Sequence, residues 1–586
     1  MTTKATQQAK FNDVGMFHTC EQCGLCSSAC PITGTEGYNV RRILRHIEME
    51  LADEMADAPL PWICTTCGRC ETVCPNGIAI LGIIRNLRAM SPDELTPDGP
   101  PPCAKACPGG IDIPGYLRLI AKGKPQEAYE LILERVPLPG VLGRVCTHPC
   151  ETQCRRGEVN QPVSICALKR FAADKAGRPS PDIVKAAPET GRKVAIVGSG
   201  PAGLTAAFFL RKKGHSVTVF EARPRAGGMM RYGIPAYRLP DDVLDREIDL
   251  ILSQGIKLKT DQQLGRDFDL AGLKQEGFEA VFMALGLPES RKINLDGAGL
   301  EGVLWGLDFL SAVRDGRGIA MKDRVLVIGG GNVAVDVALT TRRLGAKEVI
   351  MACLESRQEM PANVWEVRMA LEEGVRLMPS WGPKRVLGEN GHVAGIELIS
   401  CTAVFDAQGC FCPQFDDRIT LTEQVDQVIL AVGQSADLSC IEGECCCDLT
   451  RGVIEVDSQT QGTSIPGVFA GGDMAAGPGT IIQAIASGKR AACHIDKYLG
   501  GDGIIEAESA AGENAQSYDG ARAKGFADLP RMISPTLPVA ERLEGFKEVD
   551  ICPGDDEAIA EANRCLQCDL EFQLAVMARN CVKCHS

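Results

Sequence analysis

The chain reads KVAIVGSGPAGLTAAFFLRKKGHSVTVFEA from Lys193 to Ala222, and this stretch decides the fold of its central part. A short apolar run meets the pattern Gly-x-Gly-x-x-Gly, a helical run follows, and a second apolar run ends in an acidic residue. The pattern predicts a strand, a tight turn, a helix and a second strand. The helix N-terminus is expected to face a pyrophosphate, and the acid to accept a ribose hydroxyl. The residues expected to hold this dinucleotide are Gly198, Gly200, Gly203 and Glu221.

The length, charge and cysteine content of the chain limit what it can be. Its 586 residues suggest roughly three or four domains, and a net charge of −14 without any basic run argues against a nucleic-acid-binding protein. The first residues lack a signal sequence and no apolar run approaches the roughly 20 residues that span a bilayer, so we expect a cytoplasmic protein. In a reducing compartment, its 28 cysteines indicate iron–sulfur sites rather than disulfides.

A repeated cysteine pattern dominates the first 90 residues. Cys-x2-Cys-x2-Cys-x3-Cys-Pro occurs once from Cys20 to Pro31 and again from Cys64 to Pro75. In two-cluster ferredoxins, three thiolates of such a run bind one [4Fe–4S] cube and the fourth binds the other cube. The expected ligands are Cys20, Cys23, Cys26 and Cys74 for one cube and Cys64, Cys67, Cys70 and Cys30 for the other. A pair of zinc sites is the alternative, although zinc usually takes only two cysteines from each half-site.

The segment between the two cysteine runs is predicted to be a helix, because apolar residues recur at helical spacing from Val40 to Leu51. The second run, Trp62-Ile-Cys-Thr-Thr-Cys-Gly-Arg-Cys70, resembles the helical ferredoxin subunit of heterodisulfide reductases. The resemblance covers about the first 90 residues of the chain. It implies a mainly α-helical domain that carries two [4Fe–4S] clusters.

A second cysteine group follows a proline-rich linker at 91–102. Its members are Cys103, Cys107, Cys146, Cys150, Cys154 and Cys166. Together with GIDIPGYLRLI (110–120) and ALKRF (167–171), these residues resemble the iron–sulfur domain of the glutamate synthase small subunit and of dihydropyrimidine dehydrogenase. In that family two cubes share the domain, and a pair of ligands in an RCLxC motif precedes the segment that matches Cys103. In this chain the motif lies instead near the C-terminus, as Arg564-Cys565-Leu-Gln-Cys568.

This displaced motif predicts that the C-terminal tail folds back onto the second iron–sulfur domain. The resemblance then implies that Cys565 and Cys568 complete one cube with Cys103 and Cys154. The other cube takes Cys107, Cys146, Cys150 and a fourth ligand.

At the fourth ligand of that cube the chain departs from the family pattern. In dihydropyrimidine dehydrogenase a glutamine stands where this chain has Lys169, and an ammonium is a poor iron ligand. Cys166 lies three residues earlier, so on a helix it faces the same side, and we expect Cys166 to be the ligand. His148 is expected to be a neighbouring or turn residue rather than a ligand.

Three further glycine-rich stretches belong to nucleotide sites. Gly227-Gly228-Met-Met-Arg-Tyr-Gly-Ile-Pro-Ala-Tyr-Arg-Leu-Pro240 resembles the flavin-contacting segment of the glutamate synthase small subunit. Gly467-Val-Phe-Ala-Gly-Gly-Asp473 resembles the segment of such flavoproteins in which the aspartate bonds the ribityl chain of FAD. A second nucleotide unit begins at Arg324, and its binding residues are expected to be Gly329, Gly331 and Asn332.

The sequence therefore predicts an α/β core of two nested Rossmann-like dinucleotide-binding domains, one for FAD and one for NAD(P), plus two mainly α-helical iron–sulfur domains. The expected ranges are 1–90 and 91–190 for the iron–sulfur domains, 191–300 and 436–500 for the FAD domain, 301–435 for the NAD(P) domain, and 501–586 for a linker and the cluster-completing tail.

The choice of nicotinamide nucleotide depends on the end of the second strand of the NAD(P) unit. NADPH-using relatives place a Tyr-Arg-Arg segment there, before Met-Pro-Ala. This chain reads Cys353-Leu-Glu355 before Met360-Pro-Ala. A carboxylate suits a ribose diol and repels a 2′-phosphate, so Glu355 favours NADH. NADP(H) stays open because a phosphate could still be reached by Arg342, Arg343 or Arg357.

The remaining cysteines have no clear chemical role. The chain has no cysteine between Cys166 and Cys353, so dithiol chemistry at the flavin is not expected, and because hydride transfer belongs to the cofactors no catalytic side chain is expected either. Loop or core thiols are expected at Cys401, Cys410, Cys412 and Cys440, with a metal or redox role left open for Cys445–Cys447. Cys581-Val-Lys-Cys584-His585 matches a haem-attachment signal, but a thiol pair or a site completed by a partner subunit is favoured.

These parts together indicate how the protein handles electrons. NADH delivers a hydride, each cube carries one electron, and a flavin converts between the two. Sixteen assigned cysteines correspond to about four [4Fe–4S] clusters. The primary interpretation is an NADH-dependent iron–sulfur flavoprotein, part of a hetero-oligomeric complex, that exchanges electrons in either direction with another oxidoreductase or a ferredoxin. The alternatives are a glutamate synthase small subunit, an electron-bifurcating NAD(P)H/ferredoxin flavoprotein and a non-catalytic electron-transfer subunit.

Overall fold

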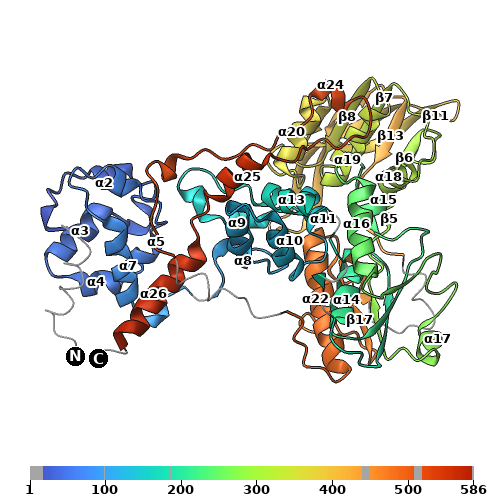
Figure 1. Cartoon of the computed structure of the whole chain (residues 1–586). Helices are drawn as coiled ribbons and strands as arrows, with labels where there is room; N and C mark the ends of the chain where they lie inside the picture. Colours follow the sequence, from blue (N-terminus) through green and yellow to red (C-terminus); the bar gives the residue numbers. More distant parts are fainter. Residues whose placement is uncertain are drawn as a thin grey trace.

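The computed structural model describes residues 17–97, 99–177, 179–180, 183–184, 186–437, 449–450, 452–506 and 518–583. Figure 1 shows helical modules at one end and in the middle of the molecule, and two α/β units at the other end. Within the described residues, no helix combines the length and the apolar character needed to cross a membrane.

The first α/β unit is built on a five-stranded parallel sheet in the order β17-β4-β1-β2-β3. Its strands are β1 (Lys193–Val197), β2 (Ser216–Phe220), β3 (Lys257–Lys259), β4 (Ala280–Met283) and β17 (Val468–Ala470). Its helices are α14 (Pro201–Lys212), α15 (Met229–Tyr232), α16 (Asp241–Leu252), α17 (Leu270–Gln275), α21 (Asp473–Ala476) and α22 (Ile481–Tyr498). Strand β17 lies far from β4 in the sequence, so another unit is inserted into this one.

The inserted unit contains a second parallel sheet in the order β6-β13-β7-β8-β9. Its strands are β6 (Val303–Trp305), β7 (Arg324–Ile328), β8 (Glu348–Cys353), β9 (Arg376–Pro379) and β13 (Gln427–Leu430). Its helices are α18 (Gly306–Arg314), α19 (Asn332–Arg343) and α20 (Val364–Glu372). An antiparallel sheet of β10 (Trp381–Glu389), β11 (His392–Phe405) and β12 (Phe411–Glu423) extends from it.

Two short strand pairs complete the α/β part of the chain. The linkers into and out of the inserted unit lie side by side, because β5 (Glu289–Ser290) pairs with β14 (Gln434–Ser435). A small hairpin joins β15 (Leu449–Thr450) to β16 (Val453–Ile454). Two nested parallel sheets with glycine turns confirm the predicted Rossmann-like fold class.

The N-terminal module is all helical within its described residues. It consists of α2 (Leu25–Ala29), α3 (Val40–Glu48), α4 (Ala52–Ala56), α5 (Leu60–Ile63), α6 (Arg69–Thr72) and α7 (Ile80–Met90). The helix predicted between the cysteine runs is α3, which buries Val40, Ile43, Leu44 and Ile47 in the same core as Cys26, Cys64 and Cys70. The spacer therefore packs directly against the cysteine loops.

The middle module is also helical, and the C-terminal tail runs across the whole molecule. The middle module contains α8 (Pro102–Lys105), α9 (Ile113–Ala121), α10 (Pro125–Leu133), α11 (Pro139–Val145), α12 (Pro149–Thr152) and α13 (Ile165–Ala176). The tail contains α24 (Val539–Arg542) near α20, α25 (Asp555–Ala562) against α9, and α26 (Cys568–Lys583) beside α7 of the N-terminal module.

A buried carboxylate joins the middle module to the flavin-side sheet unit. Glu247 of α16 accepts hydrogen bonds from the backbone N–H groups of Gly140 and Val141 (2.9 Å for Val141), at the first turn of α11. Helix α11 leads directly into Cys146, so Glu247 fixes the approach to a cysteine loop. Burial raises the pKa of Glu247 to about 7, even though the two backbone donors and nearby arginines lower it.

This raised pKa predicts a pH-dependent stability. Between pH 4.5 and about 7 the folded protein keeps a proton on Glu247 that the unfolded chain has lost, so the free energy of unfolding falls as pH rises. Above about pH 7 the ionisation of Glu247 has lowered the free energy of unfolding by its full amount, about 3 kcal/mol. Glu247→Gln should remove most of this slope when the unfolding temperature of the cofactor-loaded protein is followed from pH 5 to 8. The exposed Asp242→Asn on the same helix should keep it.

Candidate iron–sulfur and dinucleotide sites

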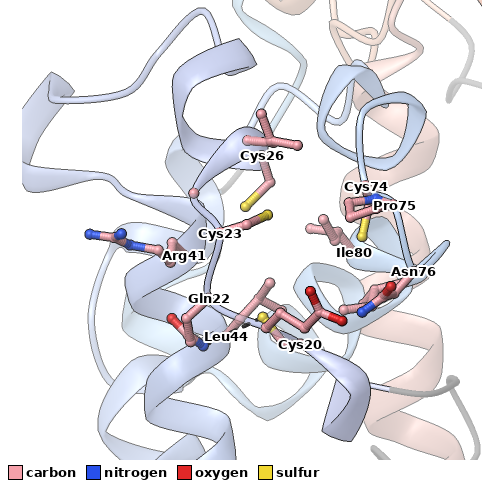
Figure 2. Close-up of a pocket in the computed structure, with 14 residues that line it drawn as sticks. Cys20, Gln22, Cys23, Cys26, Arg41, Leu44, Cys74, Pro75, Asn76 and Ile80 are labelled. Carbon is pink, nitrogen blue, oxygen red and sulfur yellow. Dashed lines mark hydrogen bonds between the residues drawn. The ribbon is translucent and has the colours of Figure 1, made fainter.

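The first thiol group lies in the N-terminal module, at the end far from the α/β units. Cys20, Cys23, Cys26 and Cys74 line one pocket, and Figure 2 shows their sulfur atoms facing it from two separate loops. The Cys23 side chain is exposed, whereas Cys26 is buried. Burial raises the pKa of the Cys26 thiol, and the neighbouring Cys20 and Cys23 raise it further.

The second thiol group consists of Cys30, Cys64, Cys67 and Cys70, and it lies deeper in the same module. Burial raises the pKa of Cys30 to about 11, with the charges of Cys64 and Cys67 adding to the effect. The Cys70 thiol has the same two neighbours and also senses Cys30. The fourth cysteine of each run thus joins the first three of the other run, as the spacing predicted.

The third thiol group joins the middle module to the C-terminal tail. Burial raises the pKa of Cys103, and the neighbouring Cys565, Cys568 and Cys154 raise it further. Burial likewise raises the pKa of Cys565 to about 12 and that of Cys568 to about 11. The tail therefore folds back and brings the displaced cysteine pair to the predicted place.

The fourth thiol group surrounds Lys169. The Lys169 side chain is buried, and although burial lowers its pKa, the charges of Cys146, Cys166, Cys150 and Cys107 outweigh this effect and raise it. The Cys166 thiol donates to the carbonyl oxygens of Leu142 and Gly143, at 3.4 Å each. An ammonium has no lone pair for a metal, so Cys166 stays the expected fourth ligand. The ring of His148 stacks on the ring of Trp365, with their centroids 4.3 Å apart. This packing fits the expectation that His148 is not a cluster ligand.

The donor chemistry of these four groups fits [4Fe–4S] cubes. Among the described side chains, no three His, Cys, Asp or Glu residues converge as the ligands of a single metal ion do. The four thiolates of a cube bind four different irons, so they stand further apart than the ligands of one zinc ion. Each group contains four cysteines from two or three separate segments, which matches one cube per group.

The first glycine turn has the shape that a dinucleotide requires. Gly198 has a φ of +104°, and a side chain there would collide with the carbonyl of Ala284. A side chain at Gly203 would collide with the carbonyl of Gly198, whereas the position of Gly200 is open. The first and third glycines are thus required by packing, and the second leaves room for a pyrophosphate. Both the backbone N–H and the hydroxyl of Ser199 donate to the Glu221 carboxylate, which lies beside the turn.

The flavin-side segments converge on the same turn. A Cβ at Gly228 would lie 2.8 Å from the Cα of Gly200, so the Gly227–Gly228 pair packs directly against the glycine turn. Asp473 begins α21, and burial raises its pKa to about 6, against the effect of the Gly479 N–H that donates to it. These small residues and one carboxylate form the cradle expected for FAD.

The second glycine turn carries the predicted acid. Gly329 has a φ of +145°, Gly331 is open, and a Cβ at Gly330 would lie 2.5 Å from a carboxylate oxygen of Glu355. Glu355 therefore stands against the turn that would receive the adenosine half of a nicotinamide nucleotide. The side-chain oxygen of Asn332 accepts a 2.8 Å hydrogen bond from the backbone of Asn363.

Two of the three arginines that could reach a 2′-phosphate have other partners. Arg342 donates to the carbonyl oxygens of Ala346 and Lys347 at 2.7 and 2.8 Å. Arg343 is buried in a salt bridge with Glu373. Arg357 is the remaining candidate, and its side chain is exposed.

Several polar contacts between modules were not expected from the sequence. Arg238 of the flavin-side segment donates to Asp336 (2.7 and 2.8 Å) and to Glu366 (2.6 Å) of the inserted unit. Glu571 of α26 is contacted by three arginines from two other segments, α7 and the tail before α24. Residue spacing gives no signal for such contacts.

The cysteines without an assigned role are described only in part. Cys401 is buried, and Cys410 and Cys412 are exposed, which fits core and loop thiols. Cys440, Cys445–Cys447 and Cys584 lie outside the described residues. The side chain of Cys581 is outside the described part of the chain as well.

Comparison with known proteins places these features in one family. The pyridine nucleotide–disulphide oxidoreductase family matches residues 192–488, dihydropyrimidine dehydrogenase domain II with its 4Fe–4S cluster matches 99–180, and a 4Fe–4S dicluster domain matches 16–78. The NADP(+)-dependent formate dehydrogenase subunit beta of Moorella thermoacetica is 39% identical over 498 residues, covering 80% of this chain and 70% of the relative.

Two enzymes of Escherichia coli K12 show a similar relationship. The NAD-dependent dihydropyrimidine dehydrogenase subunit PreT is 34% identical over 382 residues, covering 64% of this chain and 85% of PreT. The glutamate synthase [NADPH] small chain is 33% identical over 412 residues, covering 65% of this chain and 85% of the relative. These matches confirm the resemblance that the motifs predicted.

The fold, the two glycine turns and the thiol groups define an iron–sulfur flavoprotein oxidoreductase. The chain belongs to the pyridine nucleotide–disulphide oxidoreductase family, with the glutamate synthase small chain and PreT among its relatives.

The third thiol group predicts a selective loss of iron. Cys565→Ala removes a ligand that the tail contributes, so anaerobically purified protein should fall from about 16 to about 12 iron atoms per chain. The loss should be confined to the middle module, and the electron paramagnetic resonance (EPR) signals of the N-terminal pair should persist. Full iron content in this variant would contradict the assignment of Cys565.

The fourth thiol group predicts which residue completes its cube. Cys166→Ala should also lower the iron content to about 12 atoms per chain, whereas Lys169→Met should leave it near 16. Cys552→Ala, which removes a partly buried thiol outside the four groups, is the matched control and should lose no iron. Loss of iron in the Lys169 variant alone would show that the assignment of Cys166 is wrong.

Proposed function

We propose that this chain is the NADH-oxidising subunit of a complex, and that it exchanges electrons with a partner oxidoreductase or a ferredoxin through its N-terminal module. The observation that carries the proposal is the combination within one chain of a flavin cradle, a nicotinamide turn and four thiol groups. The first thiol group, with the exposed Cys23, lies at the opposite end of the molecule from the α/β units. A partner can therefore receive electrons far from the nucleotide sites.

The roles of the residues follow from this arrangement. When bound, FAD supplies the step between a two-electron hydride and single electrons. Gly200 and Gly228 let the dinucleotide approach the backbone, Asp473 is the candidate partner of the ribityl chain, and Glu221 is the candidate partner of the ribose. The four thiol groups hold the one-electron carriers, so no side chain of this protein has to act as a general acid or base.

The preference for NADH rests on Glu355. Its carboxylate stands beside the second glycine turn, where it can accept the ribose diol and repel a 2′-phosphate. Relatives are named for either nucleotide, since the formate dehydrogenase subunit is NADP(+)-dependent and PreT is NAD-dependent. The proposed preference for NADH therefore rests on Glu355 and not on the family.

Membership of a complex is supported by the relatives. Those described above are named as a beta subunit, a PreT subunit and a small chain. The N-terminal 4Fe–4S dicluster domain adds clusters on the side of the molecule that faces away from both glycine turns. A surface of this kind suits electron exchange with another protein.

The proposal predicts the response of the anaerobic holoenzyme to nicotinamide nucleotides. NADH should bleach the visible absorbance of the FAD-loaded, iron-replete protein. NADPH should do so with a kcat/KM at least about tenfold lower, because a phosphate facing Glu355 is repelled. Glu355→Gln should bring the kcat/KM values for NADH and NADPH closer together. Glu359→Gln, which changes an exposed residue of the same loop, should leave their ratio unchanged.

Two results would count against the proposal. No bleaching by either nucleotide would favour a non-catalytic electron-transfer subunit. A wild-type preference for NADPH would show that Glu355 does not set the choice.

A further inference from the structure

The four thiol groups lie in a single row through the molecule. Cys67 of the second group packs in one apolar cluster with Leu566, and Cys568 of the third group packs against the same cluster. Helix α8, which carries Cys103 of the third group, packs against helix α12, which carries Cys150 of the fourth. The third group is therefore the neighbour of both the second and the fourth.

The fourth group in turn borders the flavin-side sheet unit. A Cβ at Gly109 would lie 3.8 Å from the Cys107 sulfur and 2.8 Å from the Ile482 side chain of α22. Lys489, on the same helix, donates a 2.6 Å hydrogen bond to the carbonyl oxygen of Gly109. Helix α22 follows the Asp473 segment of the flavin cradle. The row thus begins beside the flavin site and ends at the exposed Cys23.

We propose that electrons pass along this row in the order flavin, fourth, third, second and first thiol group, and that Glu571 is the positioning residue that holds the third group against the second. This inference rests on the proposed function. For each NADH oxidised to NAD⁺ and a proton, two electrons cross the junction of the third and second groups one after the other. They leave through the first group to one-electron acceptors on the partner protein.

Glu571 is the centre of that junction. Its side chain is 2% exposed, and it accepts hydrogen bonds from Arg85 at 2.7 and 3.1 Å and from the Tyr518 hydroxyl at 2.7 Å. Arg522 and Arg88 approach the same carboxylate at 3.4 and 3.5 Å. These residues come from the N-terminal module, the tail before α24 and helix α26. One buried carboxylate therefore contacts three arginines at the meeting point of three segments, and of these arginines only Arg88 is fully buried.

The same arginines bind the backbone of both cysteine loops. Arg522 donates at 3.0 Å to the carbonyl oxygen of Thr66, next to Cys67, and at 2.7 Å to that of Leu566, next to Cys565. Arg88 donates at 2.6 Å to the carbonyl oxygen of Cys64. Arg522 thus spans the second and third groups directly, and Glu571 fixes its orientation.

Removing the charge of Glu571 takes away the common partner of the buried Arg88 and of the partly buried Arg85 and Arg522. Loss of one partner of a buried ion pair is strongly destabilising, and here the strain falls on the contact between modules rather than on either core. Neither thiol group loses a ligand. The expected consequence is a junction that opens while all clusters stay bound, which separates positioning from ligation.

The test compares rates within one molecule. Holoenzyme carrying Glu571→Gln is mixed anaerobically with NADH, and the flavin absorbance and the freeze-quenched EPR signals of the N-terminal pair are followed in time. Iron content and the rate of flavin bleaching should match those of the wild type. Reduction of the N-terminal pair should slow by roughly tenfold or more, since even 1.4 kcal/mol at the junction has that effect. Direct reduction of all clusters by dithionite should be unchanged.

The matched control is Asp528→Asn, which removes an exposed ion pair with Arg69 near the same junction. It should leave both rates unchanged. If Glu571→Gln loses iron, Arg85→Gln decides instead, because Arg85 lies nearer the rim and leaves two arginines on Glu571. A smaller slowing in that variant supports the proposal.

Wild-type reduction of the N-terminal pair in an iron-replete Glu571→Gln or Arg85→Gln protein would overturn the inference while leaving the proposed function intact. A wild-type flavin that NADH never bleaches would instead refute the proposed function itself. The two failures are therefore distinguishable.

Discussion

The structure depends on the return of the C-terminal tail to the middle module. Cys103 and Cys154 reach a set of four thiols only when Cys565 and Cys568 come back from the far end of the chain. A cube bound by both pairs would close a loop that contains both parallel sheets, and metal clips that close long loops remove the most entropy from the unfolded chain. Cluster assembly would then be linked to folding of the α/β core.

The returning tail also contacts every other module on its way. The backbone N–H of Val549 donates a 2.9 Å hydrogen bond to the carbonyl oxygen of Tyr237 in the flavin-side segment. Arg542 forms a salt bridge with Glu372 on α20 of the inserted unit. Glu548 pairs with Arg144 and Arg170 beside the fourth thiol group. These polar contacts act together with apolar packing, because one hydrophobic core joins the middle module, the flavin-side unit and α25, and another joins Val549 to the inserted unit.

The features that could be predicted from the sequence are those that residues close together in the chain determine. Gly198 and Gly329 need a left-handed backbone and close packing, and cysteine runs need fixed spacing, so both leave a readable pattern. The displaced RCLxC motif even indicated the fold-back of the tail. Arg522 and Glu571 leave no such pattern, because an ion pair between segments distant in sequence has no periodicity. The stretch 500–523 is predicted from its sequence to be a linker. In the structure, however, Arg522 joins two cysteine loops.

The buried cations have one common explanation in the charge of the thiol groups. The chain carries a net charge of −14, yet Arg88, Arg156 and Lys169 are at most 4% exposed, and each lies near cysteines. An isolated buried cation is expensive, so each needs a nearby negative charge. Thiolate-ligated clusters supply that negative charge. The buried cations in turn affect the reduction potential of a cluster, because nearby charge is one of the factors that set it. Placing cations beside successive groups therefore stabilises the loaded protein and tunes the row of carriers by the same interactions.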